Sequence, residues 1–129
     1  MNNTRKKYYK SLFLVGAFYD WILGSAFLFF YKPVFRSLGI VFPPNPAYLS
    51  LSAAFVFVLG FAYYFAYKNL KSSQNLIKLG TIYKFAYTAV GVYYFMINLL
   101  PHPVFLIFGF IDIVFAILSI EFLIYLRKR

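Results

Sequence analysis

The sequence predicts an all-α integral membrane protein, a four-helix bundle, and three observations support this. The 129 residues are 63% hydrophobic and only 12% charged, and their mean hydropathy is +0.73. They contain four apolar runs of about 20 residues, the length at which a helix crosses a bilayer. Basic residues gather around the ends of these runs, as expected at membrane surfaces. We expect one four-span domain over residues 1–129, with spans at about 11–31, 47–67, 76–98 and 103–126.

Composition also excludes several classes of function. The chain has no cysteine, so it cannot form disulfides, perform thiol redox chemistry or ligate an iron–sulfur cluster through its own thiolates. Its formal net charge of +10 would suggest nucleic-acid binding in a soluble protein. Here the basic residues flank apolar runs, where they orient a membrane protein. We therefore expect no nucleic-acid partner.

The first span, 11–31, contains one carboxylate. Its basic leading residues resemble the start of a secretory signal, but the apolar run is longer than a signal core and includes Asp20, which favours a permanent span. Gly16 and Gly24 lie one helical turn to either side of Asp20. This face therefore allows another helix to approach the carboxylate closely.

A short helix is predicted between the first and second spans. Pro33 suits the first turn of a helix and Gly39 suits its end, but the segment between them is too short to cross a membrane. We expect it to lie at the interface. Asn45 followed by Pro46 then provides a cap and a first turn for the second span, 47–67.

The third span, 76–98, carries a lysine inside an apolar run. A lysine at the centre of a span costs roughly 2.5–3.5 kcal/mol on insertion scales unless it finds a partner or water, so Lys84 should face other helices. At helical spacing, Lys84 shares a small and polar face. The other members of this face are Gly80, Thr88, Gly91 and Asn98, with Tyr87 beside them.

The fourth span, 103–126, follows a turn with two prolines. Pro103 opens it, and Asp112 lies on a face that also carries Gly109, Ala116 and Ser119. His102 is the only histidine. Because a single histidine without an acidic cluster cannot form a metal site or supply both axial ligands of a haem, we interpret it as a loop or capping residue.

Basic residues predict the orientation of the bundle. If four helices alternate in direction, ten of the thirteen Lys and Arg residues fall on one side, and only Lys32 and Arg36 fall on the other. By the positive-inside rule, both termini are cytoplasmic in a multi-pass protein of the cell membrane. The ten residues are Arg5, Lys6, Lys7, Lys10, Lys68, Lys71, Lys78, Arg127, Lys128 and Arg129.

Polar residues within the spans form the candidate site. With a rise of about 1.5 Å per residue, Asp20 and Lys84 lie at similar depth and form the favoured ion pair, while Asp112 lies some 7–9 Å nearer the outer side. A structural ion-pair network and a functional pocket both remain open. The candidate pocket residues are Asp20, Tyr64, Lys84, Tyr87, Thr88 and Asp112. We predict no catalytic residue, metal ligand or cofactor.

Four short patterns resemble the small four-helix membrane proteins of the DoxX-like type. They are Tyr19-Asp20-Trp21, Leu79-Gly80-x-x-Tyr83-Lys84, Leu100-Pro101-His102-Pro103 and Gly109-x-x-Asp112-x-x-Phe115-Ala116. The resemblance covers nearly the whole chain. It implies a four-helix bundle with cytoplasmic termini, in a functionally mixed group whose members are sometimes found beside redox enzymes.

Three functions are compatible with these features. The first is a non-catalytic accessory or scaffold subunit of a membrane complex, because the chain shows no cofactor ligands and no nucleophile with an adjacent base. The second is a protein or enzyme that binds a lipid, quinone or isoprenoid through the acidic and lysine residues. The third is an oligomeric proton-coupled exporter. The expected partners are the lipid bilayer, a larger complex or further copies of the chain, and a lipid-like ligand.

Overall fold

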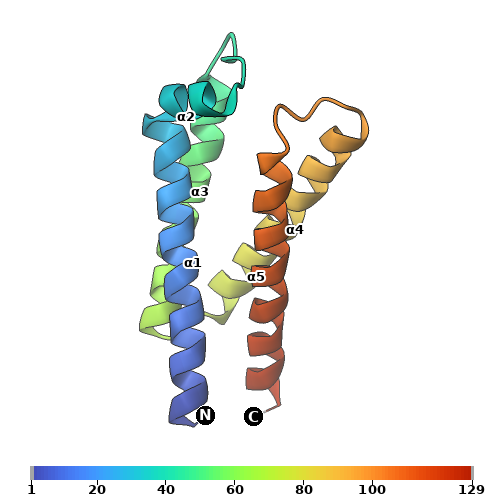
Figure 1. Ribbon diagram of the computed structural model, residues 1–129. Helices are drawn as coiled ribbons and strands as arrows, with labels where there is room; N and C mark the ends of the chain where they lie inside the picture. The colour runs from blue at the N-terminus through green and yellow to red at the C-terminus, as the bar shows by residue number, and fades with distance from the viewer. Residues whose placement is uncertain (1, 129) are drawn as a thin grey trace. The chain divides into compact units, whose positions relative to one another are not determined.

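The computed structural model describes residues 2–128 and shows an all-helical chain, with no strand in these residues (Figure 1). The predicted all-α class is therefore confirmed. The short helix expected between the first and second spans is also present. The five helices are α1 (Asn3–Phe29), α2 (Tyr31–Leu38), α3 (Ala47–Lys68), α4 (Gln74–Met96) and α5 (Val104–Arg127).

The helices form two compact units, residues 1–68 and 69–129. In the first unit, α1 and α3 pack side by side along their lengths, and α2 lies across one end of this pair (Figure 1). In the second unit, α4 and α5 contact each other, and they diverge towards the loop that joins them (Figure 1). The predicted single domain and four-helix bundle would need both units together, so they stay predictions.

Three of the described helices are long and apolar enough to cross a membrane: α1, α3 and α5. Helix α4 has 23 residues and is also long enough. Its two lysines, two threonines and several tyrosines interrupt its apolar run, and it is not among these three. Three helices of the chain are therefore compatible with a membrane protein, while membrane insertion and the fourth span stay predictions.

Small residues allow α1 and α3 to pack closely. A Cβ atom at Gly24 would lie 2.6 Å from the backbone nitrogen of Phe57, and one at Gly60 would overlap the Trp21 ring. Between these helices the Phe13 and Tyr63 rings stack with centroids 6.1 Å apart. Glycine thus brings the two backbones into contact, and aromatic rings fill the space where the helices are less close.

Helix α2 ends as its sequence predicts. Gly39 adopts a left-handed conformation with φ 72°, and Ile40 donates its N–H to the Phe35 carbonyl at 2.9 Å. This is a Schellman motif, in which an apolar residue after the glycine often contacts an apolar residue in the last turn of the helix. Phe35 and Ile40 are both buried, whereas Arg36 is exposed.

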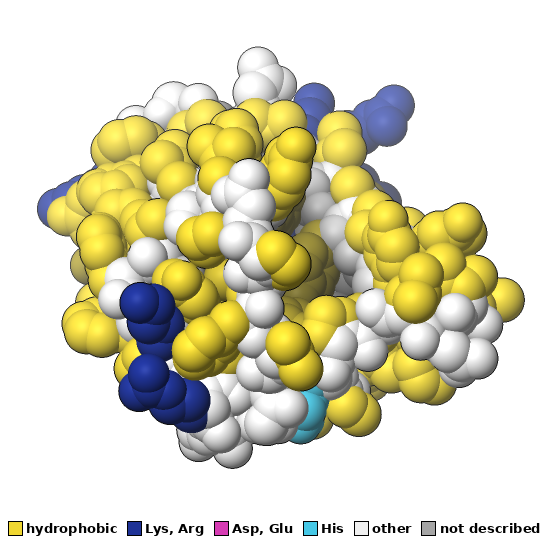
Figure 2. Space-filling view, turned by 90° about the horizontal axis from the view of Figure 1, so that it is seen from above, with side chains coloured by type: hydrophobic (Ala, Val, Ile, Leu, Met, Phe, Trp, Pro, Cys, Tyr) yellow, Lys and Arg dark blue, Asp and Glu magenta, His cyan; other side chains and the backbone are white. Residues whose placement is uncertain are grey.

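Figure 2 looks down on the end that carries α2 and shows basic side chains at the edges of a mainly hydrophobic face.

The start of α3 also follows its local sequence. The N–H of Ala47 donates to the side-chain oxygen of Asn45 at 3.0 Å. Pro46 occupies the first-turn position, where its missing N–H is not needed. Helix α3 therefore begins at Ala47, the residue at which we expect the second span to begin.

Helix α4 ends earlier than predicted. The predicted span placed Asn98 on the polar face of the helix, but the helix ends at Met96 and Asn98 has φ 60°. The Leu99 N–H donates to the Tyr94 carbonyl at 2.8 Å, and the Asn98 N–H donates to the Phe95 carbonyl at 3.1 Å. This pair of bonds is another Schellman end, and asparagine is one of the few residues besides glycine that tolerate its left-handed position. Because the residues around Asn98 are apolar, the sequence did not indicate that the helix ends before this residue.

His102 caps the start of α5. The Val104 N–H donates to His102 Nδ1 at 3.0 Å, and Pro103 immediately precedes the helix. This contact confirms the interpretation of His102 as a capping residue. The imidazole satisfies one of the backbone N–H groups that every helix leaves without a partner in its first turn.

Candidate functional site

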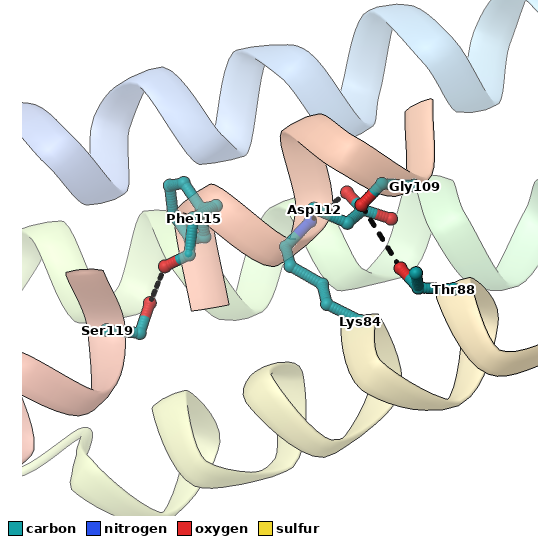
Figure 3. A network of polar contacts seen from close by, with 6 residues as sticks. All are labelled: Lys84, Thr88, Gly109, Asp112, Phe115 and Ser119. Carbon is teal, nitrogen blue, oxygen red and sulfur yellow. Dashed lines mark hydrogen bonds and ion pairs between the residues drawn. The ribbon is translucent and has the colours of Figure 1, made fainter. Parts of the chain in front are cut away.

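An ion pair between Lys84 of α4 and Asp112 of α5 is the centre of the polar contacts in the second unit (Figure 3). The distance from Lys84 Nζ to Asp112 Oδ1 is 3.0 Å. The two side chains are only 2% and 7% exposed. Charges so far from water are stabilised chiefly by each other and by hydrogen bonds, so this pair ties the two helices together in one register.

Lys84 also lies against an aromatic ring. Its Nζ is 5.1 Å from the centroid of Phe115, which lies three residues after Asp112 and hence on the same side of α5. The negative face of an aromatic ring attracts a cation, and the attraction is stronger away from water. The Asp112 carboxylate and the Phe115 ring, both on α5, therefore both hold the Lys84 ammonium group.

Thr88 makes a second contact from α4 to α5. Its hydroxyl donates to the Gly109 carbonyl at 3.2 Å, one turn along both helices from the ion pair (Figure 3). Gly109 lies close to Thr88, since a Cβ built at Gly109 would be in van der Waals contact with the Thr88 methyl group at 3.4 Å. Thr88 and Lys84 thus act on the same face of α4, as the sequence predicts.

Two further buried hydroxyls bond within their own helices. Thr81 donates to the Ile77 carbonyl at 2.8 Å, and Ser119 donates to the Phe115 carbonyl at 2.9 Å. Such bonds to the preceding turn satisfy a hydroxyl without any partner from outside the helix. The hydroxyls of Thr81 and Ser119 are therefore satisfied within α4 and α5.

Tyr87 faces a different environment, a mainly apolar groove within the second unit. The groove has a volume of about 350 Å³ and lies where α4 and α5 diverge, at the end of the unit that contains their connecting loop. Gly91 leaves space in its wall, because nothing lies within 4 Å of a Cβ built there. Its lining residues are Tyr87, Val90, Gly91, Tyr94, Leu99, Leu100, Pro101 and Phe105.

Asp20 and Tyr64 belong to the first unit. Asp20 is 1% exposed and lies on α1 between the buried glycines Gly16 and Gly24. Tyr64, on α3, packs against the Trp21 ring at 5.7 Å between centroids. Because Asp20 and Lys84 lie in different units, their predicted pairing stays a prediction.

The six predicted site residues thus fall into distinct groups. Lys84, Thr88 and Asp112 lie together, Tyr87 lines the groove, and the other two residues belong to the first unit. A functional pocket shared by residues of both units stays a prediction as well.

Sequence reasoning missed two features of this site. The position of Phe115, three residues after Asp112, could have shown that its ring faces the lysine. No pattern in the sequence predicted the groove, because the groove depends on where α4 ends and on how the loop between α4 and α5 folds back. Within residues 2–128, no group of three or more His, Asp or Glu side chains could hold a metal ion.

Comparisons with known proteins found no family model, no curated protein and no solved structure that matches this chain. The basis for a proposed function is therefore the chain's own residues and their geometry.

Proposed function

We propose that this protein is a small multi-pass membrane protein that serves as a non-catalytic accessory or scaffold subunit of a membrane complex. In this proposal α1, α3, α4 and α5 cross the membrane as a four-helix bundle related to the DoxX-like type, and both termini are cytoplasmic. The observation that carries the proposal is the buried contact between Lys84 and Asp112, because it uses the span's lysine to hold helices together.

The outer half of α4 offers a surface for a partner. From Phe85 to Met96 most side chains are exposed, including Met96 at 74%. Within this half, exposed Ala86 and Ala89 would let another helix approach closely. We propose that a helix of a second subunit packs against this half of α4.

Co-purification tests the proposed accessory function. We expect a tagged chain, extracted gently from its host membrane, to elute with a partner protein at a constant ratio through affinity and size-exclusion steps. Ala89→Phe should remove the partner because a large ring prevents close helix contact. Ala47→Phe is the matched control, since Ala47 is also exposed but lies at the start of α3. A chain that elutes without a partner, or loses it equally in both variants, contradicts the proposal.

The groove beside Tyr87 favours a second candidate function, the binding of a lipid-like chain. Its lining is almost entirely apolar, and its volume of about 350 Å³ lies at the lower end of the range for small-molecule sites, about 300–1,000 Å³. The same purification separates the two candidates when native mass spectrometry identifies bound lipid. Gly91→Leu should then remove the lipid and leave a protein partner in place, because its side chain would occupy the groove.

The proposed topology makes a separate prediction. Reporter fusions at the C-terminus, after Arg129, should indicate a cytoplasmic location, whereas fusions near Asn45 or His102 should indicate an external one. The physical reason is the excess of Lys and Arg in the segments assigned to the cytoplasm. A cytoplasmic signal at His102 would show that α4 does not cross the membrane.

A further inference from the structure

Two lysines and two tyrosines form a cluster at one end of the α1/α3 pair. The Nζ of Lys10, on α1, lies 5.0 Å from the centroid of the Tyr67 ring on α3. The Nζ of Lys68, the last residue of α3, lies 5.6 Å from the centroid of the Tyr64 ring. The two rings are neighbours, with centroids 6.0 Å apart. We call these four residues the lysine–tyrosine cluster.

The cluster carries positive charge without a nearby acid in its unit. The only Asp or Glu among residues 1–68 is Asp20, ten residues after Lys10 and hence about 15 Å further along α1. Lys6 and Lys7 are exposed on the preceding turn and add to the positive charge. Like charges held on neighbouring rings repel each other, and an anion placed beside them relieves the repulsion.

Ring contacts position the two ammonium groups. A lysine that lies over an aromatic face keeps its apolar stem packed, while its N–H groups remain available to an acceptor. The phenol hydroxyls of Tyr64 and Tyr67 can donate further hydrogen bonds. Lysine and tyrosine at the end of a membrane helix lie at the depth of the lipid head groups.

We propose that the lysine–tyrosine cluster binds the phosphate of an anionic phospholipid head group in the cytoplasmic leaflet. This inference rests on the proposed membrane placement of α1 and α3. Basic residues beside a negatively charged membrane surface attract anionic lipids, and each contributes about a fivefold gain in binding. The lipid supplies the negative charge that this end of the unit lacks, and its chains lie along the apolar helices.

A lipid titration tests this inference. The full chain in neutral detergent is titrated with dioleoyl-phosphatidylglycerol or dioleoyl-phosphatidylcholine, and native mass spectrometry measures bound lipid. We expect the wild-type chain to prefer phosphatidylglycerol. The double variant K10Q/K68Q should weaken phosphatidylglycerol binding about 25-fold, at about fivefold for each lysine, and each single variant about fivefold.

A matched control removes the same charge elsewhere. Lys32 and Arg36 are exposed on α2, at the opposite end of the α1/α3 pair (Figure 1). K32Q/R36Q should leave the preference for phosphatidylglycerol intact. Equal losses in the two double variants, or no preference in the wild-type chain, would overturn the inference. Displacement of the lipid by inorganic phosphate would also overturn it, because the site would then take a free anion.

Circular dichroism of each variant distinguishes loss of lipid from loss of fold, and the single variants remain informative if the double variant unfolds. The result is also separate from the proposed accessory function. Absence of the chain from the membrane fraction would contradict both proposals. A membrane-bound chain that keeps its protein partner but shows no lipid preference would contradict this inference alone.

Discussion

Replacing Lys84 with methionine should lower the free energy of unfolding by about 3–5 kcal/mol, the largest effect that we expect from a single substitution. Methionine matches the length of the lysine stem but leaves the carboxylate of Asp112, only 7% exposed on its side chain, without the ammonium group 3.0 Å away. An SDS titration in detergent, followed by the helical signal in circular dichroism, measures the loss.

Two further variants show whether the loss comes from the ion pair. Lys84→Met combined with Asp112→Leu should recover part of the stability, because no uncompensated charge then remains buried. Lys78→Met on the same helix is the control for loss of a lysine, since Lys78 is exposed. If Lys84→Met alone and the double variant lose the same stability, the contact with Asp112 does not stabilise the protein.

Replacing Gly24 with alanine should lower the free energy of unfolding by about 1–3 kcal/mol, the usual range for overpacking, in the same SDS titration. A Cβ at this position would lie 2.6 Å from the backbone nitrogen of Phe57. A backbone atom within a helix cannot turn away as a flexible side chain can. The α1 and α3 helices must therefore move apart, and the ring contacts between them weaken.

Gly91→Ala is the matched control for this prediction. Nothing lies within 4 Å of a Cβ built at Gly91, so the added methyl group causes no overlap. Alanine within a helix is favoured over glycine by about 0.5–1 kcal/mol, and the variant should therefore be unchanged or slightly more stable. Equal destabilisation by Gly24→Ala and Gly91→Ala would contradict close packing of α1 against α3 as the cause.

Local capping signals in the sequence predicted three helix boundaries, the end of α2 and the starts of α3 and α5. Asn45 with Pro46, Gly39 and His102 act in the structure through contacts within their own turns. Asn98 was missed because an asparagine after an apolar run fits both a helix interior and a left-handed end. The hydrogen bonds that decide between these two conformations involve only nearby backbone atoms, but the choice depends on where the following loop must go.

By itself, the sequence determined where the central parts of the long helices lie and which of their faces are polar. These properties follow from apolar composition and from the 3.6-residue period, which any stretch of chain carries on its own. It therefore placed Lys84 and Thr88 on one face of α4 and Asp112 on the face of α5 that carries Gly109.

Only the tertiary structure decided which of these side chains meet. The contact of Lys84 with Asp112 depends on the axial register and crossing of α4 and α5, which depth counted along separate helices does not give. Such a count treats helices as straight rods perpendicular to the membrane, whereas α4 and α5 diverge (Figure 1). The flexible stem of Lys84 spans the remaining difference in depth between Lys84 and Asp112. A buried charge gains more from a direct partner than the side chain loses in conformational freedom.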